Sequence, residues 1–233
     1  MLDTICLVAS PRTGANHLMS VLGNFAELCA FPDLYVSLGE RLEPQPVFER
    51  AAAEATARSK RVMAFKLWPD SLPIETVEAT ILSRSGVRLV LVMRRQIDAY
   101  VSWCKAIMLG QWQGIDTSDE RLTLDPADFA AWLDTQERWY DHWQNYLNKR
   151  FLPCPVLRYE AHIDQPPERV LKRFAAAAAQ VGITLRVPTE IVSTGLERQD
   201  RIKAVAEKVS NWPEFSRAII AKGLEKRAFG YPL

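Results

Sequence analysis

Residues suited to binding an anion are concentrated near the start of the chain, where Arg12, Thr13 and Asn16 surround Gly14. Arginine supplies a fixed positive charge, the polar side chains supply hydrogen-bond donors, and glycine lets the backbone approach a ligand closely. The segment lies between an apolar run and apolar residues at helical spacing, so we expect a strand, a loop and a helix. The N-terminus of such a helix presents free N–H groups and a positive dipole, which favour phosphate. The alternative interpretation is an ordinary turn whose polar residues only cap the helix.

A second pair of candidate residues, Arg94 and Ser102, follows another apolar run and is separated by eight positions. An arginine at the end of a strand and a serine on the next helix are able to converge on one phosphate. The arginine brings a forked cationic donor and the serine a hydroxyl. In the alternative interpretation, an arginine here pairs with Asp98 and the serine bonds within its own helix.

Strands and helices are expected to alternate along the chain, and this order gives the positions of the Arg12 and Arg94 segments in the fold. We expect strands at 4–9, 62–68, 88–93 and 155–159, where short apolar runs rich in β-branched residues occur. We expect helices at 17–22, 47–60, 73–83, 97–111, 126–150, 167–181, 198–209 and 212–222, with an irregular segment around 31–35. This alternation predicts an α/β fold with a parallel sheet, in which ligands lie at the C-terminal ends of strands. Both arginine segments occupy that position.

Aromatic residues recur at helical spacing along the long helix expected at 126–150. They are Phe129, Trp132, Trp139, Trp143 and Tyr146. Such a stripe is typical of a buried core or of an oligomer interface, which would make the protein a homodimer. A stacking surface for a sugar or lipid is the alternative.

The composition excludes several classes of protein. The chain has 233 residues, 48% of them hydrophobic and 24% charged, and its net charge is +1, which argues against binding nucleic acid through bulk positive potential. The four cysteines are scattered without metal-site spacing, so we expect free thiols and no metal. No signal peptide or apolar run long enough for a membrane span is visible, which favours a cytoplasmic protein.

Two common nucleotide motifs are missing from the sequence. No Gly-Lys-Ser/Thr follows the first loop, so a magnesium-dependent nucleoside triphosphatase loses its main signature. No Gly-x-Gly-x-x-Gly occurs either, which argues against a dinucleotide site.

Together, the two arginine segments resemble the sulfotransferases that use 3′-phosphoadenosine 5′-phosphosulfate (PAPS). The segment Pro11-Arg12-Thr13-Gly14 is similar to the family's loop for the 5′-phosphosulfate, and Arg94 with Ser102 matches its 3′-phosphate motif. Leu157-Arg158-Tyr159-Glu160 is similar to a segment whose tyrosine approaches the adenine. The resemblance covers about residues 2–183.

The chain departs from the family pattern at a few positions. Ala15 and Asn16 stand where the family has two threonines, and Gln96 replaces a common proline. The family's C-terminal Arg-Lys-Gly segment is not found. Arg198, Arg201 and Lys203 are expected on the solvated face of a helix, with late basic contacts to the donor as the alternative.

The resemblance implies a three-layer, P-loop-like α/β fold, with a central, mainly parallel sheet flanked by helices. It implies one domain over 1–233 with a helical C-terminal extension from about 184. It also implies PAPS as the co-substrate, with no metal. The expected donor-binding residues are Arg12, Thr13, Gly14, Ala15, Asn16, His17, Arg94, Ser102 and Tyr159.

Sulfuryl transfer builds negative charge on the bridging oxygen of the leaving phosphate, which a fixed cation stabilises. Arg12 is the candidate for that cation. Lys66, at the end of another expected strand, is expected to help hold the sulfonate, with an ordinary surface lysine as the alternative. The acceptor hydroxyl needs a base. His17 is one candidate because imidazole titrates near neutrality; the resemblance implies Asp33, which we prefer.

Within the family, the chain is most similar to the bacterial group that contains trehalose sulfotransferase, through Lys66-Leu67-Trp68 and the segment 102–112. This similarity implies a carbohydrate or glycolipid hydroxyl as the acceptor, bound by variable loops at 30–45 and 110–125. Two alternatives stay open. One is a catalytically degenerate nucleotide-binding member, because of Ala15 and Asn16, and the other is a P-loop-like small-molecule kinase.

Overall fold

The structure is a computed structural model that describes residues 2–35, 43–112, 114–192 and 198–232. The chain forms two compact units. The first comprises Met1–Ser10, Gly14–Met93 and Trp143–Thr194; the second comprises Pro11–Thr13, Arg94–His142 and Gly195–Leu233. The single domain expected over the whole chain, with its C-terminal extension, stays a prediction.

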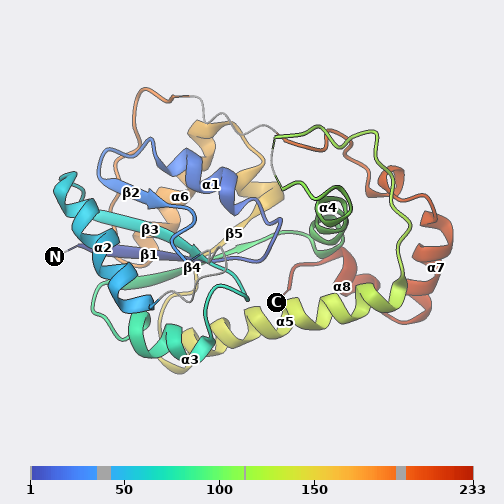
Figure 1. Cartoon of the computed structure of the whole chain (residues 1–233), viewed down its shortest axis with the longest axis horizontal. Coiled ribbons are helices and arrows are strands. Elements are labelled where there is room, and N and C mark those ends of the chain that lie inside the picture. The colour runs from blue at the N-terminus through green and yellow to red at the C-terminus, as the bar shows by residue number, and fades with distance from the viewer. Residues whose placement is uncertain (1, 36–42, 113, 193–197, 233) are drawn as a thin grey trace. The chain divides into compact units, whose positions relative to one another are not determined.

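The first unit is built on a sheet that has five strands within the described residues (Figure 1). They are β1 (Asp3–Val8), β2 (Leu28–Phe31), β3 (Val62–Leu67), β4 (Val87–Met93) and β5 (Val156–Arg158). Their order is β2-β3-β1-β4-β5, and every neighbouring pair is parallel. The predicted α/β fold with a mainly parallel sheet is therefore confirmed.

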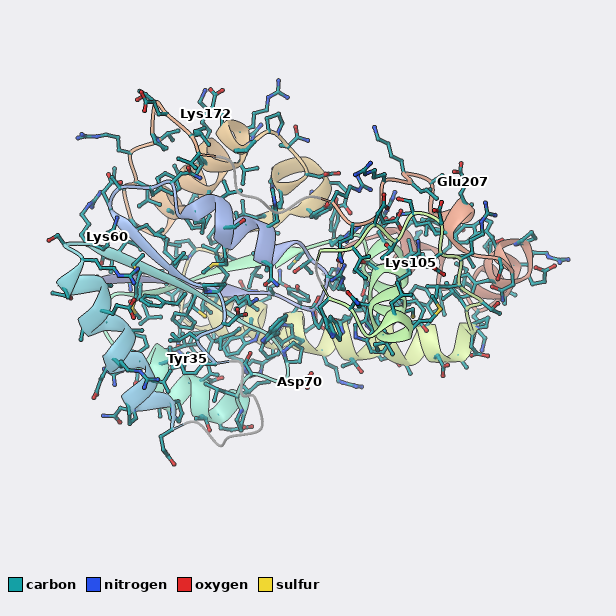
Figure 2. The ribbon with its side chains drawn as sticks, turned by 45° about the horizontal axis from the view of Figure 1, so that its top comes forward. Tyr35, Lys60, Asp70, Lys105, Lys172 and Glu207 are labelled. Carbon is teal, nitrogen blue, oxygen red and sulfur yellow. The ribbon has the colours of Figure 1, made fainter. Side chains whose placement is uncertain are left out.

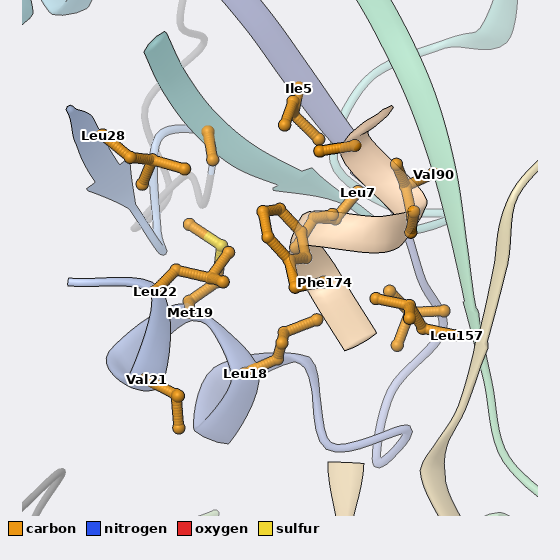
Figure 3. Close-up of a cluster of buried hydrophobic side chains, with 14 of the residues drawn as sticks. Ile5, Leu7, Leu18, Met19, Val21, Leu22, Leu28, Val90, Leu157 and Phe174 are labelled. Atoms are coloured by element: carbon orange, nitrogen blue, oxygen red, sulfur yellow. The ribbon is translucent and has the colours of Figure 1, made fainter. Parts of the chain in front are cut away.

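One face of this sheet is covered by α1 (Ala15–Leu22) and α6 (Pro167–Gln180). Ile5 and Leu7 of the central strand point to this face, where they share a buried cluster with Leu18 of α1 and Phe174 of α6 (Figure 3). The apolar residues of α6 recur at helical spacing and are buried, whereas its other face carries exposed charge. Packing of α1 on the sheet fixes the point at which the loop after β1 ends.

The other face of the sheet is covered by α2 (Pro44–Ala57), which lies beside η1 (Val77–Leu82), the continuation of α3 (Ile74–Thr76). Phe48 of α2 and Tyr35 both meet the ring of Phe65 on β3 edge-on, at centroid distances of 6.2 and 5.5 Å. The helix expected at 73–83 is thus present, although its second half is a π-helix.

The second unit is largely helical. It contains α4 (Gln96–Leu109), α5 (Pro126–Lys149) as far as His142, η3 (Val205–Lys208), α7 (Trp212–Ala221) and α8 (Glu225–Phe229). Phe129 of α5 is fully buried and packs on Tyr100 and Phe215, with centroid distances of 4.9 and 5.5 Å. In this unit the aromatic stripe of α5 therefore supplies core.

The sequence-based assignment is wrong in three places. The short strand β2 was not expected; it ends at Phe31, and the rest of the segment 31–35 is irregular as predicted. The helix expected at 198–209 is absent over 198–204, and only the single turn of η3 forms. The short helix α8 was not expected.

Candidate functional site

The loop after β1 ends at the N-terminus of α1. Gly14 is the N-cap residue of α1 and has φ +84°, a left-handed conformation that glycine adopts without strain. Because Gly14 has no side chain, it cannot cap the N–H groups of the first helical turn. An anion at this helix N-terminus would be stabilised by backbone N–H groups and by the positive end of the helix dipole.

Tyr159, the first residue after β5, lies directly against Gly14. A Cβ atom built on Gly14 would lie 2.5 Å from Cδ2 of the Tyr159 ring, which is far inside van der Waals contact. Gly14 is thus required twice, for its backbone conformation and for the space that the ring occupies. The role of Tyr159 as an adenine contact stays a prediction.

Lys66, at the penultimate position of β3, is a buried cation with only 2% of its surface exposed. Its Nζ donates to Oδ1 of Asn16 in the first turn of α1 and lies 3.2 Å from Oδ1 of Asp33. It also lies 4.2 Å from the centroid of the Trp68 ring. The alternative of an ordinary surface lysine is therefore wrong.

Burial lowers the pKa of Lys66, because the ammonium is taken out of water, and the charge of Asp33 opposes this shift. Asp33 itself is largely exposed, with 65% of its side chain accessible. The structure thus brings three predicted site residues together, Lys66, Asn16 and Asp33, and joins them through a single ammonium group.

His17, the other predicted base, is the third residue of α1 and is half-buried. Its backbone carbonyl accepts a hydrogen bond from the Ser20 hydroxyl at 2.7 Å. The choice between Asp33 and His17 as the base stays open.

Replacing Asp33 with Asn should destabilise the protein by about 1–2 kcal/mol at neutral pH, between the values for exposed and buried ion pairs. The loss should shrink as the pH rises. Burial places the folded pKa of Lys66 below its unfolded value, so stability rises with pH between the two. Without Asp33 the folded pKa of Lys66 falls further, so the stability of the variant begins to rise at a lower pH than that of the wild type. The difference in stability between the two proteins therefore narrows as the pH rises. Urea unfolding at about pH 6 and about pH 10 measures the difference.

Asp70→Asn is the matched control, because Asp70 is exposed. An Asp33→Asn loss that is equal at both pH values, or no greater than that of Asp70→Asn, would contradict the coupling of Asp33 to Lys66.

In the second unit, the guanidinium of Arg12 is held by three uncharged acceptors. Its Nε donates to the Ser102 hydroxyl at 2.9 Å. Its Nη1 donates to the carbonyl of Trp112 at 2.7 Å, and its Nη2 to Oε1 of Gln199 at 2.6 Å. These bonds hold the guanidinium in one orientation. The backbone of Arg12 has φ +67°, a conformation that is costly for a residue with a Cβ and is concentrated at functional sites.

Arg94 and Ser102 both form hydrogen bonds with Arg12, one with its backbone and one with its side chain. Nη1 of Arg94 donates to the carbonyl of Arg12 at 2.9 Å, while Ser102 accepts from its side chain. The neighbouring Arg95 pairs with Asp98. An arginine of this segment thus does pair with Asp98, as the alternative interpretation expected, while Ser102 also has a partner outside its own helix. Residues from the two motifs are thus hydrogen-bonded to one another within one unit.

Three residues around this cluster were not among the predicted site residues: Gln199, Asp200 and Lys105. The carboxylate of Asp200 lies 2.9 Å from Nζ of Lys105. The density of charge in the segment 198–203 was the available signal, but the expected helix placed these residues on a solvated face. Of the expected acceptor loops, 36–42 and 113 lie outside the described residues.

No group of His, Cys, Asp and Glu side chains suited to a metal ion occurs among the described residues. Within the same residues, no helix combines the length and apolar character needed to cross a membrane.

Neither a protein-family model nor a curated protein sequence matches the chain. Solved structures do match it. The sulfotransferase domain from the curacin biosynthetic pathway aligns with a TM-score of 0.51 and 14% identity, over 89% of this chain and 83% of that one. The sulfotransferase from Alicyclobacillus acidocaldarius aligns with a TM-score of 0.50 and 13% identity, over 98% of this chain and 94% of that one. At such identities the likeness establishes the fold.

Proposed function

We propose that this protein is a sulfotransferase that moves the sulfuryl group of PAPS to a hydroxyl of a small-molecule acceptor. The observation that carries the proposal is the hydrogen-bonded group of Arg12, Arg94 and Ser102. These are the residues that two separate sequence motifs assign to donor binding. The fold shared with two sulfotransferases supports the same conclusion.

In the proposed reaction the acceptor hydroxyl attacks sulfur in line with the bridging oxygen of the leaving phosphate. Negative charge grows on that oxygen, and Arg12 stabilises it electrostatically, since arginine does not give up a proton at neutral pH. The N–H groups at the start of α1 bind the 5′-phosphate. Arg94 and Ser102 bind the 3′-phosphate, and the ring of Tyr159 contacts the adenine.

Lys66 stabilises the transferred sulfonate, and Asp33 accepts the proton of the acceptor hydroxyl. The ion pair between them supports this assignment, since it holds the carboxylate beside the cation. The Asp33→Asn variant also separates the two base candidates, because normal turnover by this variant would assign the proton to His17.

A carbohydrate or glycolipid is the proposed acceptor. The support is the similarity of Lys66-Leu67-Trp68 and of the segment 102–112 to the group that contains trehalose sulfotransferase. Trp112 in this segment is half exposed, and its carbonyl binds Arg12. A half-exposed aromatic ring suits the apolar face of a sugar.

Two measurements test the proposal against its rivals. Calorimetry compares binding of 3′-phosphoadenosine 5′-phosphate (PAP) with binding of ATP and magnesium, and a turnover screen with sulfur-labelled PAPS then covers a panel of sugars and glycolipids. We expect PAP to bind more tightly than ATP, and label to transfer to at least one acceptor. PAP binding without transfer to any acceptor would favour a degenerate member, and binding of ATP but not PAP would favour a kinase.

Replacing Arg94 with Ala should weaken PAP binding by about 10- to 100-fold, the range for a lost hydrogen bond to a charged group. Binding of adenosine 5′-phosphate, which lacks the 3′-phosphate, should change little. Calorimetric titration of both nucleotides measures the ratio.

Arg95→Ala is the matched control, because it removes the same charge from the next position, where the side chain pairs with Asp98. If Arg94→Ala and Arg95→Ala weaken PAP binding equally, or if PAP and adenosine 5′-phosphate lose affinity alike, the 3′-phosphate assignment of Arg94 is wrong.

A further inference from the structure

The segment 198–202 in the second unit is irregular and is held by local hydrogen bonds. Nε of Arg198 donates to the carbonyl of Asp200 at 2.6 Å. The Asp200 carboxylate in turn accepts the backbone N–H of Ile202 at 3.0 Å. These local bonds place the side chains of Gln199 and Asp200 without a helix.

Asp200 is held by two buried lysines. Its Oδ2 lies 2.9 Å from Nζ of Lys105, on α4 (Figure 2), and 3.3 Å from Nζ of Lys208, on η3. The lysine side chains are 3% and 4% exposed, and that of Asp200 is 15% exposed. Because buried ammonium groups are costly without a partner, this carboxylate has a strongly preferred position between them.

The backbone of Gln199 is fixed by the same group of residues. Its carbonyl accepts the N–H of Thr117 at 2.7 Å and the Thr117 hydroxyl at 3.3 Å. The carbonyl of Thr117 accepts from Lys105 at 2.7 Å, so the lysine that binds Asp200 also binds the partner of Gln199. The lysines thus hold Asp200, and Thr117 holds the backbone of the neighbouring Gln199.

Only one of the two polar atoms of the Gln199 side chain has a hydrogen-bond partner among the described residues. Its Oε1 accepts from Nη2 of Arg12 at 2.6 Å. Its Nε2 is buried and has no hydrogen-bond partner among the described residues. A buried donor without a partner is unfavourable, and an anionic oxygen beside Arg12 would satisfy it.

An amide suits this position better than a carboxylate does. A glutamate would also accept from Arg12, but its carboxylate has no N–H to donate to an anion and would repel it. The amide orients the guanidinium with its oxygen and keeps a donor for an anion on its nitrogen.

On the basis of the proposed function, we infer that Gln199 is a further residue of the donor site. Its Oε1 orients Arg12, and its Nε2 donates to a phosphate or sulfonate oxygen of the donor. Asp200, held by Lys105 and Lys208, is a positioning residue that acts through Gln199.

Calorimetric PAP titrations of the full chain and its variants test the inference. Gln199→Met keeps the shape of the side chain and removes both polar atoms, and we expect it to weaken PAP binding by about 10-fold or more. Gln199→Glu should weaken it further, because it keeps the acceptor but loses the donor and opposes the anion. Melting temperatures establish that each variant is folded at the temperature of the titration.

A double-mutant comparison tests the role of Asp200. Asp200→Asn should weaken PAP binding in the wild-type background and add little in the Gln199→Met background, because a residue that acts through Gln199 has nothing left to position. Lys208→Met, which leaves Lys105 on the carboxylate, gives a second route to the same comparison. Asp119→Asn, at an exposed position of the same unit, is the control.

The outcomes distinguish the inference from the function on which it rests. Wild-type protein that does not bind PAP would overturn both. Wild-type protein that binds PAP with the same affinity as Gln199→Met would overturn the inference alone. An equal effect of Asp200→Asn in both backgrounds would remove Asp200 as a positioning residue.

Discussion

Replacing Arg12 with Ala is expected to lower kcat for sulfuryl transfer by roughly 10²- to 10³-fold, the loss typical of removing one preorganised group that stabilises transition-state charge. The physical reason is the way in which the guanidinium is held. Three uncharged acceptors, Ser102, the Trp112 carbonyl and Gln199, fix its orientation, so little reorganisation is needed as negative charge develops. Labelled PAPS and the acceptor found in the screen give kcat and KM.

Two further variants separate the charge of Arg12 from its geometry. Arg12→Lys keeps the charge as a point cation but loses the planar fork, so it should recover part of the lost rate. Arg12→Gly removes the side chain and also relieves the backbone strain at φ +67°, so it should be more stable than Arg12→Ala while equally inactive. An Arg12→Ala variant within a fewfold of the wild-type kcat would refute the catalytic role.

Replacing Gly14 with Ala is expected to lower the free energy of unfolding by about 3 kcal/mol or more. The left-handed backbone contributes about 1–2 kcal/mol. The remainder comes from the clash of the new Cβ with the Tyr159 ring, which lies 2.5 Å away and must be displaced from its packing on the core. Urea unfolding of both proteins measures the loss.

Gly182→Ala is the matched control for the backbone contribution. Gly182 has φ +82°, almost the same as Gly14, but a Cβ there would meet nothing within 4 Å. We expect Gly182→Ala to show the backbone cost alone, and Gly14→Ala/Tyr159→Ala to lose less than the sum of its two single changes. Equal losses for Gly14→Ala and Gly182→Ala would mean that the Tyr159 ring does not constrain the loop.

Elements with strong local signals were predictable from the sequence. The central strands β1, β3 and β4 are buried runs of apolar residues, and α5 begins at an Asp125-Pro126 pair whose carboxylate accepts the N–H groups of Ala127 and Asp128. The short edge strand β2 has four residues, too few for a clear pattern. Its conformation depends on pairing with β3, which a local reading does not contain.

The residues of the candidate site also differ in whether local sequence patterns could reveal them. Arg12, Gly14, Arg94 and Ser102 were found because their spacing within short motifs reflects local loop and helix geometry. Gln199 was missed because its contact with Arg12 joins residues 187 positions apart in the chain. The segment 198–204 has helical composition but is irregular. The pairing of Asp200 with two buried lysines is a tertiary interaction that favours this conformation over a helix.

The most direct test of the central claim is a crystal structure of the protein with PAP bound. We predict the 3′-phosphate within hydrogen-bond distance of Arg94 and Ser102, and the 5′-phosphate on the N–H groups of the loop that carries Arg12 and Gly14. A nucleotide whose phosphates contact neither the Arg94–Ser102 pair nor this loop would contradict the account.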